Sequence, residues 1–306
     1  MNTINTIVFL AAISALGGCD GPGEVAVPLD GVYPPIGEPP TVSLVESGTN
    51  PSPVRYELSA VGAQAFTLKG TFNLNTGYGS SNATLALDIT SDGTRTATPR
   101  GAASDEMHLD CVLRAPNIVP AGSTEIYTIF QTKDGSQARS TDVHYGRLLR
   151  LSGVDKARIE TQSPSNEADL IVRNASLLGC VPWPEAPIGI GGTWNTYSSY
   201  DIMGVRFRMA HQYKLLSLDK GTGTVAVTMR GVGDKTSANV RLLGKDSVSI
   251  SGDAEGEGSI HFDLRHPEAC TITYRWSCEL RGKVHTLDAT IRMAQTLTVL
   301  PDSKQK

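Results

Sequence analysis

The chain has 306 residues, with 27 Lys and Arg against 31 Asp and Glu, so its formal net charge is −4. Nucleic-acid-binding domains carry a clustered basic surface, whereas here Lys and Arg are scattered singly, so we expect no nucleic-acid partner. Beyond the N-terminus no apolar stretch approaches the ~18 residues of a transmembrane helix.

The first element in chain order is an apolar run at residues 7–16, followed by Leu16-Gly17-Gly18-Cys19. The run is too short to span a bilayer and is typical of the core of a signal peptide. The four residues resemble the lipobox of bacterial lipoproteins, whose cysteine becomes the acylated start of the mature chain. The stretch MNTINT departs from that pattern because it lacks Lys and Arg. The alternatives are an ordinary signal peptide in which Cys19 is incidental, or a buried N-terminal strand.

We therefore predict a signal peptide over residues 1–18 and lipid attachment at Cys19. The expected location is the bacterial cell envelope, with the protein anchored in the membrane by lipid and facing the periplasm or the cell exterior. Residues 19–53 are dense in Pro and Gly, a composition that buries little apolar surface, and we interpret them as a tether.

About 250 residues follow the tether, enough for one large domain or two small ones. They alternate apolar and polar residues almost throughout. In residues 205–215 the side chains of Phe207, Met209, His211 and Tyr213 share one face, which is the pattern of a half-buried strand. Gly-containing turns are expected at DKGTG and at SDGT, where the strand of residues 85–89 should end, and a Gly-rich hairpin is expected around residues 256–258.

One helix is expected at residues 167–178, capped by Asn166 and ended by Gly179. The fold class is therefore mainly β, a curved antiparallel sheet or half-barrel built from two similar β-rich halves with one short helix. The boundaries are an N-terminal half at residues 54–180, a Pro-rich connection at 181–194, a C-terminal half at 195–300 and a tail at 301–306.

Four cysteines remain besides Cys19, and an even number in an exported chain favours disulfides. They are Cys111, Cys180, Cys270 and Cys278. Three pairings are open to them; we favour Cys111–Cys180 with Cys270–Cys278, which keeps each bridge within one half. The second bridge requires a turn between its cysteines, because an extended chain would separate the two sulfurs by roughly 25 Å.

The connection CVPWPEAPIGIGGTW and the alternating strand after it resemble a family of uncharacterised bacterial lipoproteins. The pattern is P-x-P-x-x-P-[VI]-G-[VI]-G-x-x-W, matched here from Pro182 to Trp194. The resemblance implies a half-barrel like that of periplasmic lipoprotein carriers, with an apolar concave face. It implies no catalytic residue.

Two acidic or His-containing stretches invite a metal hypothesis. The first gathers His261, Asp263, His266, Glu268 and Cys270, and the second is DAEGEG at residues 253–258. Neither has the ligand spacing of a zinc site or a complete calcium loop, so we interpret them as a polar strand face and a turn, and expect no metal or cofactor.

No nucleophile motif or phosphate-binding loop is present, so we expect no enzymatic activity. An extracytoplasmic hydrolase is a remote third option beside two main hypotheses. In the first, the curved sheet binds a lipid or another apolar small ligand, lined by Phe207, Met209, His211, Tyr213 and Phe262. In the second, the apolar face is filled and the chain is a structural or protein-interaction lipoprotein. His211 would be a polar contact in the first case and a hydrogen-bonded core histidine in the second.

Overall fold

The structure is a computed structural model, and it places the following parts of the chain. These are residues 27–35, 40–57, 62–99, 106–114, 117–120, 127–128, 136–144, 147–152, 181–202, 205–238, 248–284 and 287–302. Between residues 106 and 152 only the backbone of the strands is described.

The described residues form strands and one short 3-10 helix. In chain order these are β1 (Thr41–Glu46), β2 (Thr49–Ser52), β3 (Gly62–Tyr78), β4 (Ser81–Pro99), β5 (Glu106–Arg114), β6 (Asn117–Pro120), β7 (Tyr127–Thr128), β8 (Ser136–His144), β9 (Arg147–Ser152), β10 (Ile188–Ile190), β11 (Thr193–Ile202), β12 (Val205–Asp219), β13 (Thr222–Ala238), β14 (Val248–Asp263), η3 (Pro267–Ala269), β15 (Thr271–Val284) and β16 (Leu287–Pro301).

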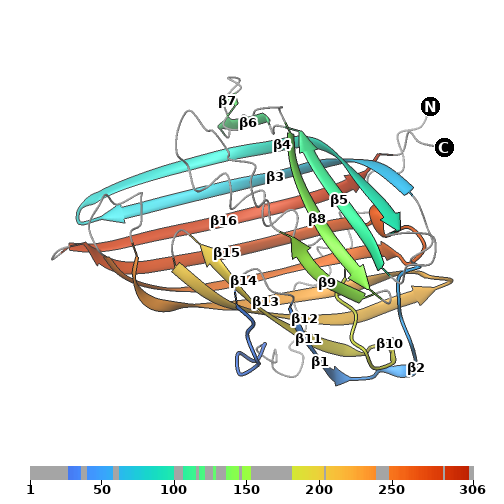
Figure 1. Cartoon of the computed structure of the whole chain (residues 1–306). Helices are drawn as coiled ribbons and strands as arrows, with labels where there is room; N and C mark the ends of the chain where they lie inside the picture. The colour runs from blue at the N-terminus through green and yellow to red at the C-terminus, as the bar shows by residue number, and fades with distance from the viewer. Residues whose placement is uncertain are drawn as a thin grey trace, which may run out of the picture.

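One antiparallel sheet contains strands from both halves of the chain (Figure 1). Its order is β1-β11-β12-β13-β14-β15-β16-β3-β4-β5-β8-β9, with β6 and β7 beside β4, and a separate two-stranded sheet joins β10 to β2. The two halves meet where β16 pairs with β3, from Ala289 opposite Tyr78 to Pro301 opposite Phe66. The fold is mainly β, as predicted, and the two β-rich halves share one continuous sheet.

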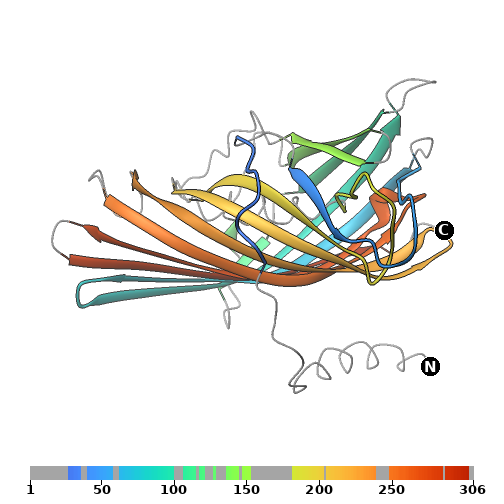
Figure 2. The same cartoon turned by 90° about the horizontal axis from the view of Figure 1, so that it is seen from below.

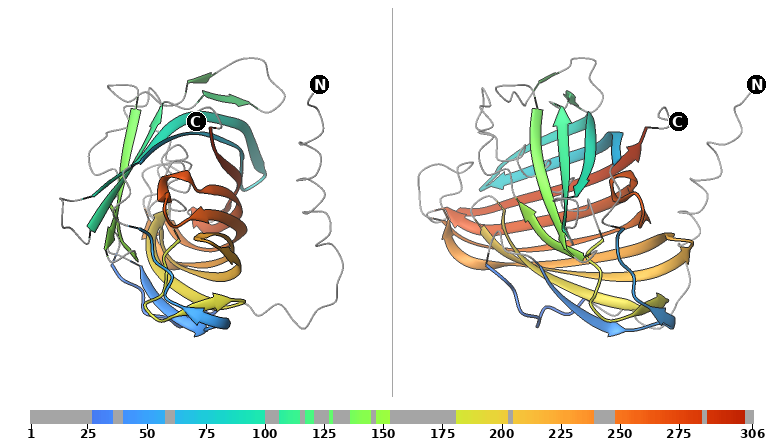
Figure 3. Two further views of the ribbon diagram at one scale, coloured as in Figure 1. Left: turned by 90° about the vertical axis from the view of Figure 1, so that its right-hand side faces the viewer. Right: turned by 45° about the vertical axis from the view of Figure 1, so that its right-hand side comes forward.

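The long central strands give the sheet its curvature. Strands β3, β4 and β12 to β16 have between 14 and 19 residues each. Because strands twist, strands of this length bend the sheet strongly. Figure 2 shows this bend along the strands, and the left view of Figure 3 shows the sheet curling so that one face is concave.

The two faces of the sheet follow from the alternation in the sequence. In β12 the buried positions Val205, Phe207 and Met209 point to the inner, concave face, and the exposed Arg206 and Arg208 point to the outer face. The turn predicted at DKGTG joins β12 to β13 through Lys220 and Gly221, whose φ angles are 48° and 88°. This two-residue turn with positive φ is the usual hairpin connection.

Two other predicted turns are wrong. Strand β4 continues through SDGT, because Gly93 pairs with Phe66 and lies buried on the inner face. Strand β14 likewise runs through Gly256 and Gly258, where the hairpin was expected. In both places a neighbouring strand continues the ladder of hydrogen bonds, which outweighs the turn preference of Gly.

The predicted tether is also too long. Residues 41–46 and 49–52 form β1 and β2, which pair with β11 and β10. The alternation in TVSLVE was obscured by the Pro and Gly residues around it. Residues 27–35, which we call the strap, lie against the outer face of the sheet.

The Pro-rich connection contains one short strand after its last proline. Residues 188–190 form β10, and Gly191 turns the chain into β11 with a φ of 82°. Val181, Trp183 and Ile188 are fully buried, so the connection packs into the concave side of the sheet.

Some predictions fall outside the described residues, namely the helix at 167–178, the signal peptide, Cys19 and Cys180. Within the described residues, no helix has the length and apolar character needed to cross a bilayer.

Candidate functional site

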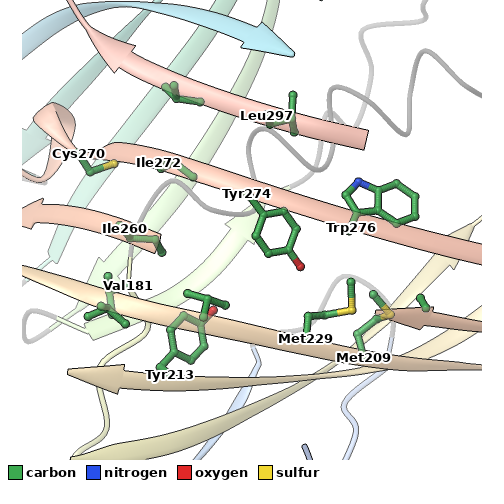
Figure 4. Packing of buried hydrophobic residues seen from close by; sticks show 14 of the residues in the cluster. Val181, Met209, Tyr213, Met229, Ile260, Cys270, Ile272, Tyr274, Trp276 and Leu297 are labelled. Carbon is green, nitrogen blue, oxygen red and sulfur yellow. The ribbon is translucent and has the colours of Figure 1, made fainter. Parts of the chain in front are cut away.

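The five predicted ligand contacts all lie on the inner face. Phe207, Met209, His211 and Tyr213 come from β12 and Phe262 from β14. Four of them are almost completely buried, with exposed fractions of 0% for Phe207, 6% for Met209, 5% for Tyr213 and 1% for Phe262. Figure 4 shows Tyr213 and Met209 among the other buried side chains of this face.

One end of the inner face is filled by aromatic rings around Trp183. The Trp183 ring centroid lies 4.9 Å from that of Phe262, 5.4 Å from that of Trp194 and 6.4 Å from that of Tyr56. Tyr213 stacks on Trp194 with 5.4 Å between ring centroids. Two predicted ligand contacts therefore belong to a packed aromatic cluster, which we call the aromatic end.

Hydrogen bonds fix the aromatic end to the connection. Trp194 donates from Nε1 to the carbonyl oxygen of Pro182 at 2.9 Å, and the amide of Val181 donates to the Tyr56 hydroxyl at 2.7 Å. The sequence analysis missed the role of Trp183. The sequence feature that could have indicated it is a tryptophan between two prolines, because a large apolar ring is unexpected in a solvent-exposed linker.

Further along the inner face, side chains cover glycines of neighbouring strands. Phe207 lies over Gly233 and Gly252, where an added Cβ would sit 2.9 Å and 3.0 Å from the ring. The sulfur of Met209 lies over Gly231, where the corresponding distance is 2.2 Å. These glycines let the large side chains lie close to the backbone of the sheet, which fills space that a pocket would otherwise occupy.

His211 is the polar member of the predicted ligand set. It is half-buried, next to Tyr213 with 6.3 Å between ring centroids, and pairs across the sheet with Thr196 and Met229. Burial lowers the pKa of His211 to about 4, so the ring is neutral at pH 7. A neutral imidazole on this face suits a core position and gives no proton relay with a described neighbour.

A second polar group lies at the edge of the apolar core, where β4 meets η3. Arg95 is 2% exposed and donates from Nη1 to Cys270 Sγ at 2.7 Å and to its carbonyl oxygen at 3.1 Å. Glu268, 4% exposed, lies with Oε1 3.2 Å from Nδ1 of His266. Within the described chain no set of three or more His, Cys, Asp or Glu side chains is arranged to hold a metal ion.

The cysteines of the C-terminal half correct one predicted disulfide. Cys270 precedes β15 and Cys278 lies within it, and no turn interrupts the strand between them. Both are buried and are not joined in a disulfide, so the Cys270–Cys278 bridge is wrong. Burial raises the pKa of both thiols, to about 12 for Cys278, which makes them poor nucleophiles. The Cys111–Cys180 bridge lies outside the described side chains.

The outer face has a hollow of about 1110 Å³ across β13, β14, β15, β16 and β3, which we call the outer trough. One cross-strand row runs along it; the row is Arg230, Glu255, Ser277, Ala294 and Asn73. The small side chains of Ser277 and Ala294 leave the middle of this row low. Asp253, Glu255 and Glu257, suggested by sequence as a calcium loop or turn, point outward from β14 here.

Ion pairs border the outer trough on both sides. Arg275 pairs with Glu257 on one side, and on the other Glu279 accepts hydrogen bonds from Arg281 and Arg292. The Arg281 hydrogen bond and then that of Arg292 lower the pKa of Glu279 to about 2. The trough therefore presents paired charges of both signs, and it is better suited to bind the polar surface of a partner than an apolar ligand.

The strap packs on the outer face beside this trough. Val27, 3% exposed, contacts Tyr197 and Ala210 in a small apolar cluster with Leu29 and Tyr33. The rings of Tyr33 and Tyr197 meet edge to face at 5.4 Å. Burial, and next the neighbouring Tyr197, raise the pKa of Tyr33.

Comparisons with known proteins give no family. No protein-family description and no curated protein matches the chain. Among solved structures, Pseudomonas aeruginosa OccK2 (OpdF) is similar with 8% identity over 79% of this chain and 98% of that chain, at a TM-score of 0.21. The same protein in complex with glucuronate gives 9% identity over 78% and 98%, at a TM-score of 0.24. Similarity at these TM-scores supports no functional argument.

Proposed function

We propose that this chain is a non-enzymatic lipoprotein of the bacterial cell envelope, anchored through Cys19, that acts as a structural or protein-interaction module. The observation that carries the proposal is the filled aromatic end. Tyr213 and Phe262, which the carrier hypothesis needs as pocket walls, are buried by Trp194 and Trp183. A partner would then contact the polar outer face, whose trough is open.

The chemistry of the described residues favours binding over catalysis. The two described thiols have raised pKa values, and His211 is held neutral by burial. Glu279 is held ionised by two arginines, so it is not suited to exchange protons near pH 7.

A second function keeps the apolar carrier hypothesis, and the side-chain chemistry in the middle of the inner face favours it. Met209, Met229, Tyr274 and Trp276 form an apolar strip there; their exposed fractions of 3% to 6% mean that a ligand would have to displace these side chains (Figure 4). Methionines adapt to ligands of varied shape. The resemblance to lipoprotein carriers supports the same reading.

Two measurements test these proposals. The mature protein extracted from membranes should carry the added mass of acyl chains on Cys19, and a Cys19→Ser variant should lack this mass and leave the membrane fraction. An unacylated wild-type chain would contradict the anchor.

Native mass spectrometry of the wild-type protein, in a mild detergent and after incubation with membrane lipids, separates the two functions. An unliganded mass supports the filled module. A bound lipid of a few hundred daltons that is lost on solvent extraction, and reduced in a Met209→Asp variant, would favour the carrier.

A further inference from the structure

The outer face beside the strap carries an uncommon concentration of positive charge for a chain of net charge −4. The exposed cations of β12 and β13 on this face are Arg206, Arg208, Lys214 and Arg230. Arg230 pairs across the sheet with Ala210, on which the strap rests, so these cations surround the seat of the strap. We call them the basic stripe.

Three of the four cations of the basic stripe form no ion pair. Among the described residues, Arg206, Lys214 and Arg230 take part in none, while every arginine of β15 and β16 on the same face does. In the strand register Asp201 lies opposite Arg206 and Glu255 lies opposite Arg230, and Asp30 belongs to the strap. Four cations against these three carboxylates leave the stripe a small positive balance.

The strap ties this face to the anchor. Val27 is fixed on the outer face, and only eight positions separate it from Cys19. A chain of that length reaches at most about 29 Å when fully extended. As a flexible coil it spans roughly 16 Å on average. An acyl anchor at Cys19 would thus keep the strap side of the body close to the membrane surface.

Packing of the strap makes this short connection firm. An added Cβ at Gly31 would lie 2.3 Å from the Tyr197 ring, so only Gly allows the strap to approach so closely. The Arg208 guanidinium carbon lies 5.8 Å from the centre of the Tyr33 ring. Tyr33 also donates its hydroxyl hydrogen to the carbonyl oxygen of Leu29 at 3.2 Å, which shapes the strap.

We propose that the basic stripe lies against anionic phospholipid headgroups of the membrane that holds Cys19, so that the strap side of the outer face is oriented toward the bilayer, while the side formed by β15, β16 and β3 stays open to a partner. This inference rests on the lipid anchor proposed above. An anionic surface attracts basic residues that lie within about one Debye length of it. The acyl anchor keeps the protein close to the membrane, and the basic stripe determines which face of the protein turns toward it.

Depth-dependent quenching in vesicles tests this orientation. The acylated full chain is reconstituted into phosphatidylcholine vesicles with about 30% phosphatidylglycerol and a headgroup nitroxide quencher. A fluorophore is attached to Thr228→Cys on the outer face of β13, or to Asn82→Cys in the hairpin between β3 and β4. The unsubstituted protein, labelled in parallel, gives the background.

We expect the quencher to reduce the fluorescence of the Thr228→Cys label about twofold or more relative to the Asn82→Cys label. The reason is that the attraction between the basic stripe and the anionic headgroups holds the label on β13 close to the membrane surface. The difference should disappear without phosphatidylglycerol, and in 0.5 M salt, where the Debye length is ~4 Å. It should also disappear when Arg206→Glu and Lys214→Glu are combined. The matched control, Lys69→Glu with Lys283→Glu, changes net charge equally and should keep it.

Equal quenching of the two labels in an acylated protein would overturn the orientation alone and leave the anchor intact. Loss of the difference in the control pair as well as in the stripe pair would also overturn it, because net charge would then be the cause. A protein without acyl mass would overturn both the anchor and this inference.

Discussion

The inner and outer faces of β15 are made from alternating residues of one strand, yet they differ in kind. Tyr274, Trp276 and Cys278 point inward and are buried to 6% or less. Arg275 and Glu279 point outward into ion pairs that water reaches. Buried contacts are intolerant of changes in volume, while exposed ion pairs contribute little to stability. The inner face should therefore determine stability, leaving the outer face available for contacts with partners.

The largest expected effect comes from removing the ring at the centre of the aromatic end. Trp183→Ala should lower the free energy of unfolding by about 4 kcal/mol, because it leaves a cavity among Tyr56, Trp194 and Phe262. Urea denaturation measures it. Trp183→Phe is the control and should cost much less, since Trp183 Nε1 has no described hydrogen-bond partner. A loss below about 1 kcal/mol for the alanine variant would show that the aromatic end is not well packed.

A smaller loss is expected where β3 approaches β16. In Gly70→Ala the new Cβ would lie 2.0 Å from the backbone carbonyl oxygen of Thr296, which a rigid strand cannot relieve by moving a side chain. We expect a loss of about 2 kcal/mol in unfolding free energy. Gly77→Ala on the same strand is the matched control, since its nearest neighbour is the side-chain oxygen of Asn82 at 3.1 Å. Equal losses at both positions would point to strand propensity rather than contact.

The stability of the protein should depend on pH because of His211 on the inner face. Its folded pKa of about 4 lies below the unfolded value, so the unfolded chain binds the proton more readily and stability falls as pH drops from about 6.5 to 4. The loss attributable to this histidine should be roughly 2–3 kcal/mol. Thermal unfolding of His211→Gln at pH 7 and pH 4.5 measures it. If the variant lost as much stability between pH 7 and pH 4.5 as the wild type, His211 would not be the source of this pH dependence.

The smallest effect is expected on the outer face. Glu279→Gln removes the negative charge that pairs with Arg281 and Arg292, and should cost only about 0.5 kcal/mol at low salt, and less in 1 M salt, because the ion pairs are exposed. The low pKa of Glu279 means that its stabilisation is present above pH ~4.5 and is lost only as the pH falls toward about 2. Chemical denaturation at two salt concentrations measures it. A loss comparable to that of Gly70→Ala would mean that the outer face also supports the fold.

Alternation of side chains predicted much of the fold. The stretches at residues 85–89 and 205–215 lie in β4 and β12, and the hairpin turn at Lys220 and Gly221 is where the sequence placed it. The period of two is a local property of a strand with one buried face, so it can be read directly. Turn preference was less reliable, because the strands continue through Gly93 and Gly256, and at Gly256 an added Cβ would lie 2.8 Å from the carbonyl oxygen of Arg275.

The sequence by itself determined the strand class, the inward residues Phe207, Met209, His211, Tyr213 and Phe262, and the outward charges that alternate with them. Only the tertiary structure decided that Trp183 fills the concave end, that β16 joins the two halves through β3, and that Cys270 and Cys278 lie apart. Each of these depends on contacts between segments distant in the chain. The same holds for the strap, whose seat on Tyr197 and Ala210 is set by packing across some 170 residues of sequence, a separation that no local pattern encodes.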